Sequence, residues 1–193
     1  MTGKLIIISA PSGTGKSTVI GRLIDDPELL LAFSVSCTTR KPREGETDGV
    51  DYYFISEEQF RKHIDANELV EYQEVYPGRF YGTLKSEIDR INALGKNVVL
   101  DIDVQGGINV KKIFGDTALA IFLAPPSLEA LRERLTKRGT DSQEEIERRV
   151  GKADQEMHYA RYYDFMVVND DLDLAVEQVR DLIVEHIDPE IEE

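Results

Sequence analysis

The chain is poor in cysteine, in basic residues and in long hydrophobic runs. Cys37 is the only cysteine among 193 residues, so the sequence offers neither an internal disulfide nor a cysteine-based zinc site. The longest apolar stretch near the start, Leu5 to Ile8, is too short for a membrane span or a signal-peptide core. We therefore expect a cytoplasmic protein that has no membrane partner.

Positive charge is outweighed by negative charge. Lys and Arg total 23 against 37 Asp and Glu, which gives a formal charge of −14. Part of the acidic excess lies in the tail after Val184, which we expect to be solvated. Such a chain disfavours a nucleic-acid partner, because that binding needs basic surface to displace counterions from phosphates. The arginines that are present gather at Arg40 and Arg43 and between Arg132 and Arg149, which favours a small phosphate-bearing ligand.

Short apolar runs alternate with helical patterns over most of the chain. Residues 4–9, 97–101 and 118–123 are apolar and rich in β-branched or aliphatic residues, which predicts buried strands of a parallel sheet. Further strands are predicted at 33–36 and 165–168. Helical spacing is found within 17–31, 85–94, 104–113, 127–137, 144–160 and 172–186. The predicted fold class is α/β, with a mainly parallel sheet flanked by helices.

Residues 34–83 break this alternation. A polar stretch with glycine and proline at 40–49 predicts a loop, and Ser56 precedes a helix start of capping-box type. Residues 69–75 and 79–83 then predict two short strands. We interpret this segment as a compact, strand-rich insertion.

A glycine-rich loop at residues 10–17 follows the first predicted strand and precedes a helix. Gly13 and Gly15 allow backbone N–H groups to converge on phosphate oxygens, while Lys16 would reach the β- and γ-phosphates. Ser17 would place its hydroxyl on Mg²⁺, and the helix would direct its positive end at the nucleotide. The first position of the usual pattern is glycine, and here it is Ala10. The alternative interpretation is an ordinary glycine-rich turn.

Two other groups of polar residues can each be interpreted in two ways. Asp101 ends an apolar strand and Asp103 shares its face, at the sheet edge where ligands bind in open α/β folds. A carboxylate in this place assists Mg²⁺ in many phosphate-loop enzymes, although it could also serve only as a strand-end cap. Arg40 and Arg43 could grip a phosphate, or lie on a solvated surface loop.

At the level of motifs the sequence resembles the guanylate kinases over nearly its whole length. The block from Ser36 to Glu46 is rarely met outside that family. The matching segments are Ser9 to Thr18, Ser34 to Glu46, Gly49 to Phe54, Phe80 to Thr83, Asp101 to Gly106 and Arg138 to Thr140.

The resemblance implies a P-loop nucleoside monophosphate kinase fold. Its core would comprise residues 1–33 and 84–193 with a helical lid at about 127–155, and residues 34–83 would form the insertion that binds guanosine monophosphate (GMP). The implied GMP site comprises Ser36, Arg40, Arg43, Tyr52, Glu71, Tyr81, Thr83, Asp101 and Asp103. The implied ATP site comprises Ala10, Pro11, Ser12, Gly13, Thr14, Gly15, Lys16, Ser17, Thr18, Arg134, Arg138 and Asn169. The implied catalytic residues are Lys16, Arg40, Asp101, Arg138 and Arg149. Mg²⁺ would be held by Ser17 and, directly or through water, by Asp101.

The implied reaction moves the γ-phosphoryl group of ATP to GMP or dGMP. One alternative is the same architecture with another small phosphate acceptor, which Glu71 and Thr83 disfavour because their chemistry suits guanine. The other is a non-catalytic guanylate-kinase-like module that binds phosphopeptides, which the intact pair of Lys16 and Ser17 disfavours. The sequence leaves open whether the chain forms a homo-oligomer.

Overall fold

A five-stranded parallel sheet forms the core of the computed structural model, which describes residues 3–188. Its strands lie in the order β2-β7-β1-β8-β9, and every neighbouring pair is parallel. The bounds are β1 Leu5–Ser9, β2 Leu31–Phe33, β7 Asn97–Asp101, β8 Ala118–Ala124 and β9 Phe165–Val168. The α/β class with a mainly parallel sheet is therefore confirmed.

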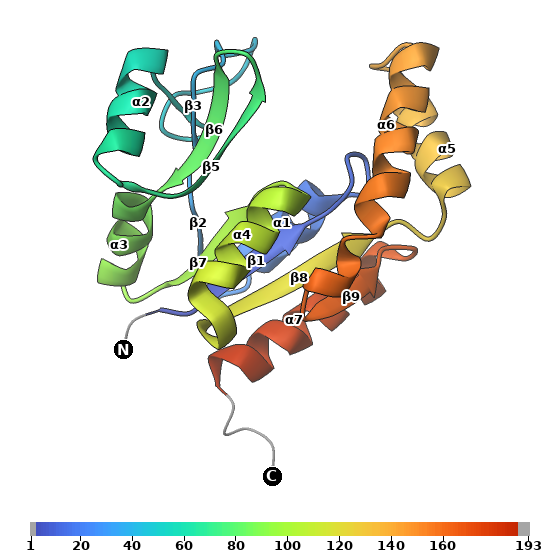
Figure 1. Ribbon diagram of the computed structural model, residues 1–193. Helices are drawn as coiled ribbons and strands as arrows, with labels where there is room; N and C mark the ends of the chain where they lie inside the picture. Colours follow the sequence, from blue (N-terminus) through green and yellow to red (C-terminus); the bar gives the residue numbers. More distant parts are fainter. Residues whose placement is uncertain (1–2, 189–193) are drawn as a thin grey trace.

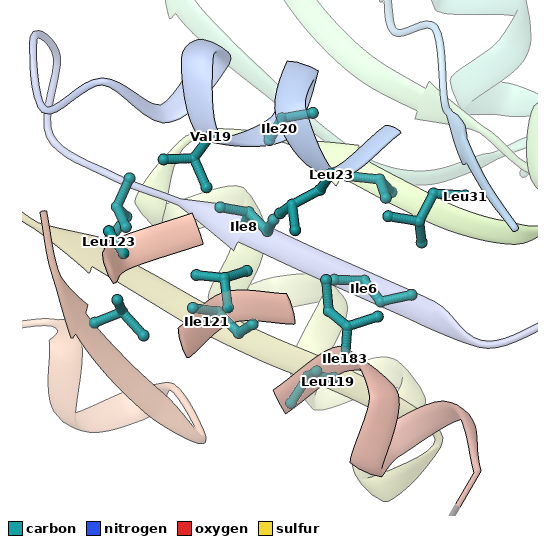
Figure 2. Packing of buried hydrophobic residues seen from close by; sticks show 14 of the residues in the cluster. Ile6, Ile8, Val19, Ile20, Leu23, Leu31, Leu119, Ile121, Leu123 and Ile183 are labelled. Carbon is teal, nitrogen blue, oxygen red and sulfur yellow. The ribbon is translucent and has the colours of Figure 1, made fainter. Parts of the chain in front are cut away.

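Helices cover both faces of this sheet (Figure 1). Helices α1 (Lys16–Ile24) and α7 (Leu172–Ile187) pack on one face, while α3 (Lys85–Ala93) and α4 (Val104–Phe114) pack on the other. Figure 2 shows the first of these layers, where Ile6 and Ile8 of β1 lie between side chains of α1 and of β8. The central strand is thus buried on both faces, and its ends are fixed by packing.

Residues 37–84 contain a second, four-stranded sheet in the order β4-β3-β6-β5. The strands are β3 Cys37–Thr38, β4 Tyr53–Phe54, β5 Leu69–Tyr76 and β6 Arg79–Leu84, and helix α2 spans Glu57–Asp65. Ser56 caps α2 with a full capping box to Gln59, as its spacing predicts. A small core of its own, with Phe60 stacked on Phe80 at 5.2 Å between ring centroids, makes this sheet a rigid platform beside the main one.

A pair of helices stands across from this second sheet, on the same side of the core (Figure 1). They are α5 (Leu128–Arg138) and α6 (Gln143–Met157), which pack against each other through a separate apolar cluster. Two short 3₁₀ turns, η1 at Gly115–Thr117 and η2 at Ala160–Tyr162, complete the described elements. Within residues 3–188, the structure has no helix that is long and apolar enough to cross a membrane.

Two local predictions need correction. The helix expected within 17–31 ends at Ile24, because Asp26 precedes Pro27 and a residue before proline disfavours helical geometry. The strand expected at 33–36 lies instead at Leu31–Phe33. After Val184 the chain is helical as far as Ile187, with Glu185 and Asp188 exposed, and residues 189–193 of the expected solvated tail lie outside the described residues.

Asn97 ties three segments of the main sheet together. Its side chain, 7% exposed, accepts from the Lys4 backbone N–H and donates to the Leu29 carbonyl, both at 2.8 Å. We expect Asn97→Leu to lower the free energy of unfolding by about 2–4 kcal/mol, because two backbone groups lose their partners. Urea unfolding measures this. The control Asn109→Leu removes one side-chain contact on α4 and should change stability by about 0.5 kcal/mol or less; equal effects would contradict the prediction.

Candidate active site

A cleft of about 770 Å³ lies where the main sheet, the second sheet and the α5–α6 pair meet. The loop after β1 forms its floor, β5 and β6 form one wall, and α5 and α6 contribute to the other. It is lined by Ala10, Pro11, Ser12, Gly13, Gly15, Lys16, Ser17, Thr18, Ser36, Tyr52, Glu71, Gln73, Val75, Tyr81, Gly82, Asp101, Ile102, Asp103, Arg134, Leu135, Arg138, Lys152 and Glu156. The structure therefore brings most of the predicted site residues together.

The glycine-rich loop has the backbone geometry that the sequence predicts. Gly13 and Gly15 have φ of 94° and 102°, in the left-handed region that side chains disfavour. Both the N–H and the hydroxyl of Thr14 donate to the Pro11 carbonyl. The Asn169 side chain, which is buried, donates to the Thr14 carbonyl at 2.7 Å. Asn169 thus holds the loop from behind, and its predicted contact with ATP stays a prediction.

The parallel register explains how a charged pair forms on the cleft floor. Ile8 of β1 pairs with Asp101 of β7, so both strands end side by side at the loop. Lys16, the first residue of α1, forms a salt bridge with Asp101 and donates to the Ile102 carbonyl at 3.0 Å. The lysine ammonium group is therefore held in the cleft and ready to meet an anionic ligand.

The groups near Lys16 and Asp101 fit a magnesium ion that is bound mainly by the phosphates of a small molecule. Ser17 and Asp101 supply a hydroxyl and a carboxylate to the same cleft, and Mg²⁺ prefers oxygen ligands. Within residues 3–188 no group of three or more His, Cys, Asp and Glu residues could hold a metal ion. In proteins that bind Mg²⁺ with a nucleotide, one or two protein groups usually join substrate phosphates and water around the ion.

Glu71 is a half-buried carboxylate in the wall of the cleft. Burial, opposed by the hydrogen bond from Thr83 and helped by the charge of Asp103, raises its pKa from 4.5 to about 7. The Thr83 hydroxyl donates to it at 3.0 Å. On the other side, a Cβ added at Gly106 of α4 would lie 3.1 Å from its Oε2. Glu71 is therefore a fixed hydrogen-bond acceptor, and a ligand with N–H donors would stabilise its ionised form.

The arginines of the polar loop differ in their placement. Arg40 is nearly buried and makes two hydrogen bonds of 2.8 Å to Glu46, which hold the pKa of Glu46 near 2. Its guanidinium lies 5.3 Å from the ring centroid of Tyr52, and Tyr52 meets Tyr81 edge to face at 5.9 Å. Arg43 has an exposed side chain outside the lining of the cleft.

The arginines of α5 and α6 are held by partners that the sequence did not indicate. Arg149 donates to the Ser12 hydroxyl of the glycine-rich loop at 2.8 Å, and it pairs with Asp141 and Glu145. Arg134 donates to the Asn169 carbonyl at 2.8 Å.

Arg138 lines the cleft from the end of α5. The α5–α6 pair is thus linked to the loop, with cations directed toward it.

Sequence reasoning missed the carboxylates that orient the arginines, and it missed the three other polar side chains that line the cleft. Glu46 lies within the recognised motif block, so its spacing from Arg40 could have indicated a pair; Asp141 and Glu145 carry no comparable signal. The missed wall residues are Gln73 on β5 and Lys152 with Glu156 on α6. Burial raises the pKa of Glu156, and the Lys152 charge opposes that shift.

Comparison with known proteins gives a consistent result. The sequence model of the family described as guanylate kinase matches residues 2–186. A guanylate kinase of Porphyromonas gingivalis is 59% identical over 184 residues, which cover 95% of this chain and 98% of that protein. One from Bacteroides thetaiotaomicron is 52% identical, covering 98% and 93%. The crystal structure of guanylate kinase from Anaplasma phagocytophilum has a TM-score of 0.76 at 29% identity, covering 96% and 87%.

Two glycines close together in the chain allow a matched test of the loop. A Cβ at Gly15 would lie 2.6 Å from the Asn169 amide nitrogen, at positive φ, whereas a Cβ at Gly21 of α1 would meet nothing within 4 Å. We expect Gly15→Ala to lower stability by about 1–2 kcal/mol and to weaken binding of a nucleoside triphosphate strongly. Gly21→Ala should raise stability by about 0.5–1 kcal/mol and leave binding unchanged.

Thermal unfolding and calorimetric titration with ATP make these measurements. Equal ATP affinity of the two folded variants would show that the loop does not bind the phosphates.

Proposed function

This chain belongs to the guanylate kinase family, and we propose that it transfers the γ-phosphoryl group of ATP to GMP or dGMP, giving ADP and the guanosine diphosphate. The observation that carries the choice of acceptor is the half-buried Glu71 carboxylate, fixed in the cleft wall by the hydrogen bond from Thr83. Guanine presents N1–H and a 2-amino group as adjacent donors, and one carboxylate accepts from both. Adenine has a lone pair at N1 and no 2-amino group, so beside adenine Glu71 would keep only the hydrogen bond from Thr83 and gain none from the base.

The acceptor phosphate has a binding place next to the base site. Tyr52 and Tyr81 line the cleft. Arg40 lies behind Tyr52, and hydrogen bonds to Glu46 orient its guanidinium. A phosphate dianion would compete with the Glu46 carboxylate for the Arg40 guanidinium, since both accept bidentate hydrogen bonds. In this proposal Arg43 approaches from the loop surface once the phosphate is present.

The donor triphosphate lies over the glycine-rich loop in this proposal. Backbone N–H groups around Gly13 and Gly15 point at the β-phosphate, and Lys16 leaves Asp101 in part to meet the γ-phosphate. Ser17 and Asp101 would hold Mg²⁺, which neutralises charge on the phosphate oxygens when it is bound. Arg138 and Arg149 bring further positive charge from α5 and α6.

Positioning and electrostatics account for catalysis without a protein base. A phosphate monoester loses its second proton at about pH 6, so near neutral pH the acceptor oxygen already carries charge. Phosphoryl transfer then requires that two anionic groups be brought into line and their charge offset by cations. The walls formed by β5–β6 and α5–α6 would exclude water and so protect ATP from hydrolysis.

A panel of acceptors tests this proposal. ADP release is measured with guanosine, adenosine, cytidine and uridine monophosphates, and we expect kcat/KM for AMP to fall about 10⁴-fold below that for GMP, because the Glu71 acceptor gains no hydrogen bond from adenine. Lys16→Ala, purified in the same way, should be inactive and controls for contaminating kinases. Equal turnover of the four acceptors would overturn the assignment of GMP.

The raised pKa of Glu71 predicts a pH dependence of GMP use. The ionised carboxylate accepts from both guanine donors, so kcat/KM for GMP should rise with pH through about 7. The KM for ATP should not share this inflection. In Glu71→Gln the inflection near 7 should be lost, leaving that of the GMP phosphate near pH 6. An unchanged profile in this variant would show that Glu71 does not titrate in the reaction.

A further inference from the structure

Glu87 is a buried carboxylate outside the lining of the cleft. It lies in the first turn of α3, and it is 3% exposed. Its Oε1 accepts from the Val35 N–H at 3.3 Å and from Arg90 at 2.7 Å, while its Oε2 accepts from the Tyr53 hydroxyl at 3.1 Å and from Arg90 at 3.0 Å. Burial raises the pKa of Glu87, but these hydrogen bonds outweigh burial and hold the pKa below its usual value. The carboxylate is therefore ionised near neutral pH.

The partners of Glu87 lie where the second sheet joins the core (Figure 1). The chain enters the second sheet through residues 34–36, which include Val35, and it leaves where β6 runs directly into α3. Helix α3 packs on the main sheet through Ile88 and Ile91. Glu87 therefore ties the incoming connection to the outgoing helix, and through that helix to the core.

Val35 and Tyr53 each adjoin a residue that lines the cleft. Val35 precedes Ser36, Tyr53 follows Tyr52, and both Ser36 and Tyr52 belong to the cleft lining. The Tyr53 N–H also donates to the Ser36 carbonyl at 2.9 Å, so these two segments are held to each other as well as to α3. Loss of the Glu87 contacts would therefore displace Ser36 and Tyr52, while the glycine-rich loop on the cleft floor has no part in these contacts.

We infer that Glu87 is a positioning residue for the acceptor nucleotide, which holds β3 and β4 against α3 and so sets where Ser36 and Tyr52 meet GMP. Small displacements of binding groups weaken a site even when their cause lies outside it, because recognition depends on geometry that supporting contacts maintain. This inference rests on the proposed function, since it takes Ser36 and Tyr52 as part of the GMP site.

The experiment compares Glu87→Gln with Asp89→Asn, which makes the same chemical change at an exposed position of the same helix. The glutamine amide nitrogen can only donate, so donors among Val35, Tyr53 and Arg90 lose an acceptor. We expect KM for GMP to rise about threefold to tenfold in Glu87→Gln, the range that one lost hydrogen bond supports. KM for ATP in this variant, and both KM values in Asp89→Asn, should change less than about twofold. Steady-state kinetics and calorimetric titration with each nucleotide measure these effects.

Tyr53→Phe provides a second variant, because it keeps the carboxylate and removes only the hydrogen bond from β4. We expect KM for GMP to rise about twofold to fivefold in this variant while KM for ATP stays unchanged. If Glu87→Gln fails to fold, the comparison of GMP with ATP in Tyr53→Phe decides.

A loss confined to GMP supports the role of Glu87 in positioning the acceptor. Equal losses for GMP and ATP overturn it, and so does an unchanged KM for GMP, whether or not thermal stability falls, because Glu87 then supports the fold alone. Failure of the proposed function gives a separate result, since the unaltered protein would then show no preference for GMP over AMP.

Discussion

The parallel pairing of β1 with β7 and β8 is the constraint on which the site depends. Five consecutive residues of β1 are buried, and the strand is hydrogen-bonded on both edges. Its end is therefore fixed, and the loop that follows must turn within a few residues into α1. The same pairing places Asp101 beside that turn. The salt bridge of Lys16 with Asp101 is thus a consequence of strand register.

Negative charge organises the positive groups of this acidic chain. Arg40 is held by Glu46, and Arg149 by Asp141 and Glu145. Each carboxylate fixes a guanidinium near the place where a phosphate would bind, at the cost of competing with it. An arginine that is already oriented loses less side-chain entropy when it binds a phosphate. The ion pairs therefore fix the orientation of each guanidinium, while their competition lowers its affinity for the phosphate. The charge of −14 is therefore compatible with a site for two anionic nucleotides.

Local patterns in the sequence predicted the parts of the structure that local forces determine. Buried strands such as Ile6–Ile8 follow from hydrophobic runs, and the loop geometry of Gly13 and Gly15 follows from a motif that requires left-handed backbone. Helix α1 ends at Ile24, earlier than its helical periodicity predicts, because Pro27 disfavours helical geometry in the residue before it. The position of Asn169 behind Thr14, 155 residues away, could not be predicted, since that contact depends on how β9 and the loop pack together.

The wall of the cleft shows how one strand can divide a recognition task. On β5, alternate residues face the cleft, so Glu71 and Gln73 present an acceptor and a donor in succession, while Tyr72 between them is largely exposed. On the neighbouring strand β6, Thr83 lies opposite Glu71 and Tyr81 lies opposite Gln73. A ligand that extends along the hairpin therefore meets the carboxylate of Glu71 at one level and the side chains of Gln73 and Tyr81 side by side at the next. Since the strand period fixes their spacing, a rigid nucleotide gains specificity there with little rearrangement of the backbone.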